Sequence, residues 1–238
     1  MSLFFTNFPK TKYDVFFDNQ QVDIVDIFRI VKVKKSFKDD ITFYTFYNVQ
    51  DGERPDVVST KLYGTPDYYW TFFMLNDNLV NLHKDWPLST SDALHLVDKK
   101  YPGYVVVTDD DISTKFVKDN VVEGLISGAR AKVIAKDPDL GVMRIEPISG
   151  TLQDNELLYD SITTDFITIK SYALWKDVAH HYEDVDGNYV TKSTLGATPI
   201  SNEQYEFALN DDKSSIKVIR PQYVQAIADQ FIEQIQAE

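Results

Sequence analysis

Histidines and acidic side chains are the groups of this chain that could catalyse a reaction or bind a metal ion: there are four histidines, 37 acidic residues and no cysteine. His180 and His181 are adjacent, and neighbouring strand residues point to opposite faces, so they form a poor pair of ligands. The run "EDVDGN" (183–188) offers calcium-type oxygens, but an EF-hand places Gly sixth and Glu twelfth, and this run does neither. Asp186 and Gly187 are typical of a hairpin turn instead. The run 109–111 reads as a solvated loop, so no metal site is predicted.

Motifs for nucleophilic catalysis and for nucleotide binding are missing from the sequence. It contains no Gly-x-Ser-x-Gly elbow, phosphate loop or dinucleotide fingerprint, and His83 and His95 suggest no triad. A carboxylate pair for glycoside cleavage would go unrecognised among so many acids, because their spacing in three dimensions is not visible. The lack of cysteine excludes disulfides, thiol catalysis and Cys-ligated zinc. We predict a protein that is not an enzyme and has no cofactor.

The charge balance argues against a nucleic-acid partner. The net charge is -13 and the sequence pI is near 4.7, which repels phosphate backbones. A local basic cluster, "VKVKKSFK" (31–38), is followed at once by Asp39 and Asp40 and is better explained as a solvated strand or turn. No apolar run is long enough for a signal peptide or a membrane span. We therefore expect folding in a reducing cytosol, with no membrane contact.

Aromatic residues and prolines organise the first segment. The aromatic and β-branched run 43–50 predicts a strand. Pro55 suits the first position of a helix that Gly64 ends, and Pro66 suits the first position of a second helix. Helices joined by so short a turn must pack together, so the aromatic stripe of the second helix is predicted to be mostly core. That stripe contains Tyr69, Trp70, Phe73 and Met74.

Downstream of this hairpin the pattern changes twice. A third helix is predicted after Ser89, followed by a strand in "GYVVVTDDD" (103–111). From about 116 to 169, short alternating runs are separated by turn residues, which predicts a small antiparallel barrel.

The last segment is predicted to begin with a hairpin turning at Asp186-Gly187, which a polar loop follows. Residues 216–219 then read as a strand. Pro221 opens an amphipathic helix, and two alternatives stay open: it packs on its own domain or on a partner. Its apolar stripe contains Val224, Ile227, Phe231 and Ile235.

The segment from 43 to 78 resembles a LysM module, in the helix ending "KLYGTP", the "YYW" of the second helix and the Asn-rich exit. LysM modules usually have a β-α-α-β fold and often bind N-acetylglucosamine polymers such as peptidoglycan. Here "NLHKDWPLSTSDALHL" (81–96) stands where such a module normally closes with a strand. Peptidoglycan binding is therefore the less favoured alternative.

More of the chain is similar to one family. Three stretches, 26–33 ("DIFRIVKV"), 54–78 and 215–235, occur in the same order in the LysM-containing baseplate wedge proteins of T-even-like contractile-tailed phages, the gene product fifty-three family. The resemblance implies a structural subunit of the virion tail baseplate, which joins neighbouring wedges through contacts with other wedge subunits. A tail-associated muralytic enzyme ranks last among the alternatives.

The predicted fold class is α+β: a LysM-like β-α-α module, an inserted small antiparallel β-barrel and a C-terminal amphipathic helix. The predicted domains are 1–115, an N-terminal arm and LysM-like domain; 116–170, the barrel; and 171–238, the hairpin, loop and C-terminal strand and helix. Aromatic anchors and the Asn-rich exit are the predicted partner-binding residues. They are Tyr68, Tyr69, Asn76, Asp77, Asn78, Tyr223, Ile227 and Phe231.

Overall fold

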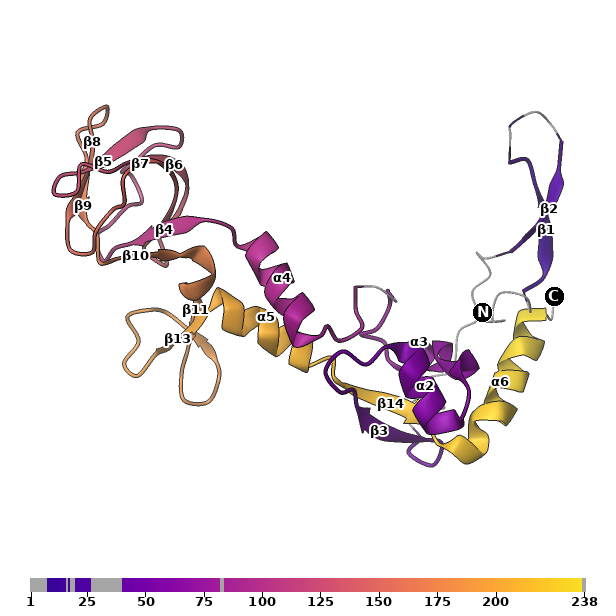
Figure 1. The fold of residues 1–238 in the computed structure, drawn as a ribbon. Helices are drawn as coiled ribbons and strands as arrows, with labels where there is room; N and C mark the ends of the chain where they lie inside the picture. Colours follow the sequence, from indigo (N-terminus) through magenta and orange to yellow (C-terminus); the bar gives the residue numbers. More distant parts are fainter. Residues whose placement is uncertain (1–7, 16, 18–19, 27–39, 82–83, 237–238) are drawn as a thin grey trace. The chain divides into compact units, whose positions relative to one another are not determined.

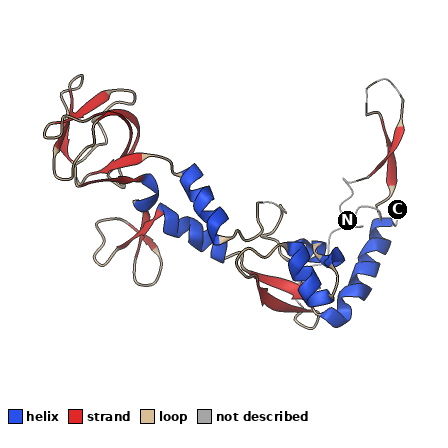
Figure 2. Cartoon of the chain, in the orientation of Figure 1, coloured by secondary structure: helices blue, strands red, loops and turns tan. Residues whose placement is uncertain are grey.

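The chain folds into two compact units that both contain helices and strands (Figure 1, Figure 2). The computed structural model describes residues 8–15, 17, 20–26, 40–81 and 84–236. The first unit comprises Met1–Thr90 and Asn210–Glu238, and the second comprises Ser91–Leu209. The basic cluster 31–38 and His83 lie outside the described residues. The predicted α+β class is confirmed in its mixed composition.

The first unit is built on a two-stranded antiparallel sheet whose strands are far apart in the sequence. Strand β3 (Tyr44–Asn48) pairs with β14 (Ser215–Ile219), from Tyr44 opposite Ile219 to Asn48 opposite Ser215. Both strands were predicted, but their pairing was not. The helices that come after β3 in the sequence therefore pack against β14, a strand that comes after the whole second unit in the sequence.

Proline and glycine set the helix ends in this unit. Helix α2 (Pro55–Tyr63) begins at Pro55 and ends at Gly64, whose φ of 76° is left-handed. The predicted second helix is instead divided into a 3-10 turn, η2 (Pro66–Tyr68), and the short helix α3 (Trp70–Leu75).

The aromatic stripe of the second predicted helix is core, as predicted. Trp70 and Phe72 are buried, and Tyr69 and Phe73 pack against the main cluster of the unit. That cluster joins helix and strand residues that the chain brings together from both of its ends. Its buried members are Val49, Val58, Phe72, Leu79, Trp86, Ile216 and Val218.

Helix α6 (Pro221–Gln236) packs on its own unit, which is the first of the two alternatives left by its sequence; a contact of its outer face with a partner stays a prediction. Val224 and Ile235 are buried, and the Phe231 ring stacks on Trp70 with centroids 4.9 Å apart. The first unit also contains a hairpin, in which β1 (Lys10–Tyr13) pairs with β2 (Val22–Val25).

The second unit contains a seven-stranded antiparallel sheet in the order β10-β4-β7-β6-β5-β8-β9, which curls around an apolar core (Figure 1). Among the residues described, the two end strands of that order form no ladder with each other, so the sheet is curled and open. Closure into a barrel stays a prediction. The strands are β4 (Tyr104–Val107), β5 (Val121–Gly124), β6 (Arg130–Asp137), β7 (Val142–Ser149), β8 (Leu157–Asp160), β9 (Phe166–Thr168) and β10 (Ser171–Leu174).

The remaining elements of this unit are helices α4 (Thr90–Lys100), α5 (Asn202–Asp211) and η3 (Trp175–Asp177), and a sheet of β11 (Ala179–Glu183), β12 (Tyr189–Val190) and β13 (Thr198–Ser201). The β11–β12 hairpin turns at the predicted Asp186-Gly187. The prediction of a polar loop after this hairpin is wrong, because β13 and α5 lie in that segment. The sheet reaches from β4 to β10, so both predicted domain boundaries, 115/116 and 170/171, fall inside the second unit.

Candidate protein interface

The two predicted partner-binding segments, 68–78 and 223–231, meet in the first unit. Tyr68, Tyr223 and Ile227 are partly buried and pack against the same cluster. That cluster is formed by Tyr44, Leu75, Ile219 and Val224. These three side chains therefore contribute to the unit's own packing, and only their outer edges face solvent.

Tyr63 links the helices to the sheet beneath these residues. Its hydroxyl donates to the backbone oxygen of Ile219 at 2.9 Å, and its ring meets Tyr68 edge to face at 5.8 Å. Burial raises the pKa of the Tyr63 hydroxyl well above its usual range, so the group stays protonated as a donor. The position of Tyr68 is thus held by a partly buried neighbour.

Asn76 is buried and binds the outer edge of β14. Its Nδ2 donates to the backbone oxygens of Phe72 at 2.7 Å and Lys217 at 2.9 Å. Its Oδ1 accepts from the backbone N–H of Lys217 at 2.8 Å. The amide therefore pairs with one residue of a strand edge as another strand would, and its hydrogen-bonding groups are used within the unit.

Asp77 and Asn78 differ from Asn76, because both are exposed where the chain leaves α3. Leu79 then returns to the core, and its N–H donates to the backbone oxygen of Asn76 at 3.0 Å. Val80 is again exposed, at 84 %. Among the predicted partner-binding residues, Asp77 and Asn78 at the exit of α3 are thus the exposed ones.

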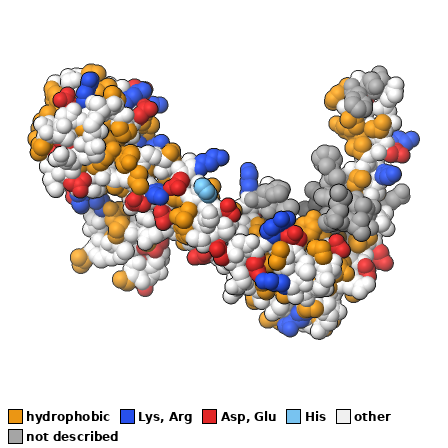
Figure 3. Space-filling view, in the orientation of Figure 1, with side chains coloured by type: hydrophobic (Ala, Val, Ile, Leu, Met, Phe, Trp, Pro, Cys, Tyr) orange, Lys and Arg blue, Asp and Glu red, His pale blue; other side chains and the backbone are white. Residues whose placement is uncertain are grey.

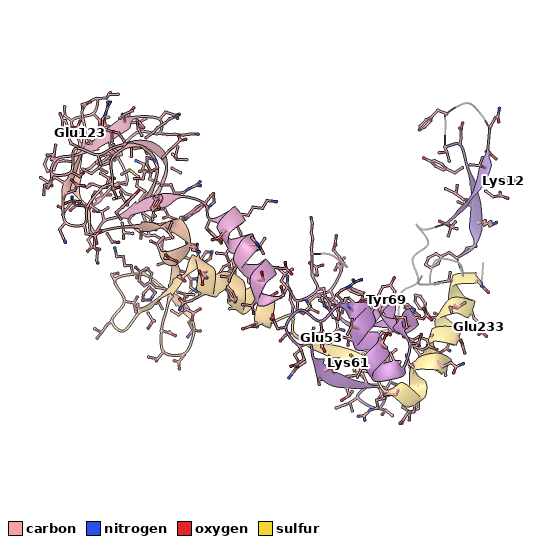
Figure 4. All side chains as sticks on the ribbon, in the orientation of Figure 1. Lys12, Glu53, Lys61, Tyr69, Glu123 and Glu233 are labelled. Carbon is pink, nitrogen blue, oxygen red and sulfur yellow. The ribbon has the colours of Figure 1, made fainter. Side chains whose placement is uncertain are left out.

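Glu53 was not predicted, although it organises the junction of β3 and α2. Its carboxylate accepts from Tyr47 and from the backbone N–H of Gln50, each at 2.9 Å, and pairs with Lys61, which lies beside it in Figure 4. Burial opposes its charged form, but these hydrogen bonds outweigh burial and lower the pKa of Glu53. The available signal was an acidic residue two positions before the proline that begins a helix.

The hairpin presents one apolar face, which was also missed. Tyr13 is opposite Val22 and Lys12 is opposite Asp23, so the two pairs lie on opposite faces. Tyr13 is 50 % exposed, and the described hydrophobic clusters contain none of the hairpin's side chains. Figure 3 shows apolar atoms along one side of this ribbon and charged groups along the other. The alternation of apolar and acidic residues in Val22, Asp23 and Ile24 was the sequence signal for this apolar face.

The adjacent histidines correct another expectation. A register shift in β11 between Ala179 and His181 brings the Nδ1 atoms of His180 and His181 to 2.9 Å, so the two rings do not point to opposite faces. Burial, and then the charge of His181, lower the pKa of His180. His181 Nε2 lies 2.8 Å from a carboxylate oxygen of Glu183.

The acidic runs have local partners. Asp184 accepts from the backbone N–H groups of Asp186 and Asn188, which fixes the hairpin turn. Asp109 pairs with Lys170 and Lys192. Within the described part of the chain, no group of three or more His, Cys, Asp or Glu is placed to hold a metal ion. No helix in that part combines the length and hydrophobicity that crossing a bilayer requires.

Comparison with known proteins gives one family. Residues 3–120, just under half of the chain, match the family model described as base plate wedge protein 53. This stretch contains the hairpin, β3, α2, η2 and α3 of the first unit, but not β14 or α6, and it extends into the second unit. No curated protein matches the chain. The match supports a baseplate wedge protein family.

Proposed function

We propose that this protein is a structural subunit of a phage tail baseplate, located in the virion and bound to other baseplate proteins. The observation that carries the proposal is the match of residues 3–120 to the base plate wedge family. The absence of any recognisable catalytic motif in the sequence is consistent with a structural role. The finer part of the proposal is that the protein joins neighbouring wedges by direct contacts.

The hairpin is the surface that we assign to this contact. A two-stranded hairpin is at best marginally stable alone in water. Its apolar face, with Tyr13 and Val22 half-exposed, lacks cover from the described clusters of its own unit. Covering that face with a second wedge subunit would stabilise the hairpin and would bury apolar surface at the same time. The exposed α3 exit, with Asp77 and Asn78, is a second proposed contact.

The test is incorporation into baseplates during infection by a phage that lacks the gene, with the protein supplied from a plasmid. Replacing both Tyr13 and Val22 by Ser is expected to lower the amount that co-sediments with baseplates by at least about tenfold, since two apolar anchors are lost. Lys12→Gln, on the opposite face, is the matched control. Normal incorporation of the double variant would refute the hairpin contact, and absence of the wild-type chain from baseplates would refute the function itself.

The first unit also supports the proposal of a LysM-like module. Its order of β3, α2, α3 and β14 has the β-α-α-β pattern, with the closing strand supplied from residues 215–219. Co-sedimentation with insoluble peptidoglycan tests whether the module binds glycan. We expect no saturable binding of peptidoglycan, because we assign the exposed α3 exit of this module to protein contacts. Saturable binding without release of soluble fragments would favour the wall-binding alternative, and release would favour the muralytic one.

A further inference from the structure

The second unit contains a cavity of about 380 Å³ between its two sheets and its helices. Residues from β6, β7, η3, β11 and α5 line it, together with Tyr101 after α4. The volume lies within the range of small-ligand sites. All of its lining residues belong to this one unit, so the cavity is formed without any other part of the chain.

Arg144 provides the principal polar feature of the cavity wall. Its guanidinium carbon lies 3.8 Å from the centroid of the Trp175 ring, and Tyr101 packs edge to face on the same ring at 5.1 Å. Within the described residues the guanidinium of Arg144 makes no hydrogen bond and no ion pair, whereas its backbone belongs to the sheet. A guanidinium has five N–H donors in a planar fork. Stacking on an indole restrains the plane of that fork and leaves its edge available to an acceptor.

Lys136 also belongs to the cavity wall, but its ammonium points away from the cavity. Lys136 pairs with Met143, a member of the interior core, so its side chain lies on the face of the sheet opposite to Arg144. Its Nζ is held there by three backbone oxygens, those of Ile112, Ser113 and Lys115, at 2.5–3.0 Å. The opposing charge on the wall is Asp137, which is exposed.

Asp137 and His180 are already engaged locally. One oxygen of Asp137 accepts from the backbone N–H groups of Asp139 and Leu140. The ring of His180 stacks on Tyr205 at 3.8 Å. Burial lowers the pKa of His180, so the ring is neutral at neutral pH and adds no charge to the cavity. Arg144 therefore presents the positive charge to the cavity, and the carboxylate of Asp137 is already engaged by backbone N–H groups.

We propose that the cavity binds a carboxylate group, held by the edge of the Arg144 guanidinium. A guanidinium and a carboxylate match as two parallel N–H···O bonds, which a neutral amide cannot reproduce. The aromatic floor of Trp175 and Tyr101 would contact the carbon atoms next to the carboxylate. The carboxylate comes either from an acidic side chain of another protein or from a free small acid. This site does not depend on the baseplate role.

The experiment follows the Arg144 Nε–Hε and Trp175 indole resonances of the full-length ¹⁵N-labelled protein by NMR. The probes are N-acetyl-glutamate methylamide, its glutamine counterpart, acetate and inorganic phosphate. Both resonances are expected to shift saturably with the glutamate probe, with at least about tenfold weaker binding of the glutamine probe. Equal binding of the two probes, tighter binding of phosphate, or no shift would overturn the proposal.

Variants separate a binding role from a packing role. R144Q is expected to abolish the Trp175 shift, and R130Q, on the exposed part of β6, should leave it unchanged. R144K keeps the charge but loses the fork, and about tenfold weaker binding is expected. If R144Q perturbs the fold, the test rests on R144K, provided that its spectrum shows an intact fold. Wild-type affinity of R144K for the glutamate probe would overturn the proposal that the guanidinium fork binds the carboxylate. Acetate binding as tightly as the glutamate probe would support the site and assign it to free small acids.

Discussion

Glu156 is a fully buried carboxylate in the second unit, and hydrogen bonds explain how its charge is tolerated. It accepts from the backbone N–H groups of Ile126, Ser127 and Gln153 and from the Ser127 hydroxyl, at 2.6–3.1 Å. A Cβ on Gly124 would lie 2.6 Å from both carboxylate oxygens, so glycine is required beside it. Two loops of the curled sheet are thus tied together by one side chain.

Replacing Glu156 by Gln is expected to destabilise the second unit by roughly 2 kcal/mol, because an amide nitrogen then faces N–H donors. Hydrogen exchange of the amides in 121–169 measures this locally. Glu123→Gln, an exposed acid on β5 that Figure 4 labels, is the control and should leave exchange unchanged.

The same substitution has a pH signature. Burial would raise the pKa of Glu156, but its four hydrogen bonds outweigh burial and lower it. A lowered pKa contributes stability above the unfolded value of about 4.3, and that contribution is lost as pH falls through the folded pKa. The stability difference between wild type and E156Q should therefore shrink below that pH. A difference independent of pH would show that the charge of Glu156 contributes nothing.

Asn76 and Asn78 allow a structural role to be separated from a partner-binding role. Asn76→Ala removes three hydrogen bonds and leaves the N–H and oxygen of Lys217 unpaired at the strand edge, so we expect a loss of roughly 2 kcal/mol. Asn78→Ala, at an exposed position, should stay within about 0.5 kcal/mol of wild type. Urea unfolding followed by exchange of β14 amides measures both. Equal stabilities of the two variants would mean that the hydrogen bonds of Asn76 to the edge of β14 do not stabilise the unit.

At the scale of elements, periodicity predicted the helices that bury an apolar stripe. It failed for α5, where the buried side chains include the polar Asn202 and Glu206. Asn202 donates to the backbone oxygens of Trp175 and Val178, and Glu206 accepts from Tyr101 at 2.8 Å. A polar buried face leaves no apolar stripe to detect. The reciprocal Ser201–Gln204 capping box was the one usable signal.

Strand pairing was the other limit of prediction. The aromatic and β-branched residues of β3 and β14 were sufficient to predict both strands. Their pairing, with Tyr44 opposite Ile219, was not predictable, because it depends on how the chain between the two strands folds. The histidine pair shows the same limit on a smaller scale, since a bulge depends on the partner strand. The sequence pointed to the aromatic residues that were predicted to bind a partner. It did not predict their partial burial, because that burial results from helix α6, which comes from the far end of the sequence.

Helix α6 is expected to be a stability element of the first unit. Phe231→Ala removes the stacked ring from Trp70 and should cost roughly 2 kcal/mol, because the ring is only partly buried. Trp fluorescence during urea unfolding reports the change. Glu233→Ala, an exposed position on the same helix that Figure 4 labels, should unfold as wild type does. A stable F231A variant that fails to enter baseplates would instead assign Phe231 to a partner.

On the scale of the whole molecule, the second unit is an insertion into the first, and the two ends of the first unit's chain meet where it enters. The side chain of Asn210 donates to the backbone oxygen of Leu88 at 3.0 Å and accepts from its N–H at 2.8 Å. The N–H of Thr90 is held by Asp51 at 2.6 Å. The entry and exit of the inserted chain are thus fixed side by side by groups of the first unit alone.

A chain in which a Gly-Ser linker of about six residues joins Thr90 to Asn210 is therefore expected to fold, because closing a short flexible loop costs little. Hydrogen exchange should show β3 and β14 amides as protected as in the full chain. The control ends at Thr90 and lacks β14 and α6, so it loses the core residues Ile216 and Ile219 and should be unfolded. If the linked chain is also unfolded, the first unit requires the second for stability. If it is folded, incorporation of this chain into baseplates tells whether the hairpin and α3 exit are sufficient for assembly without the inserted unit.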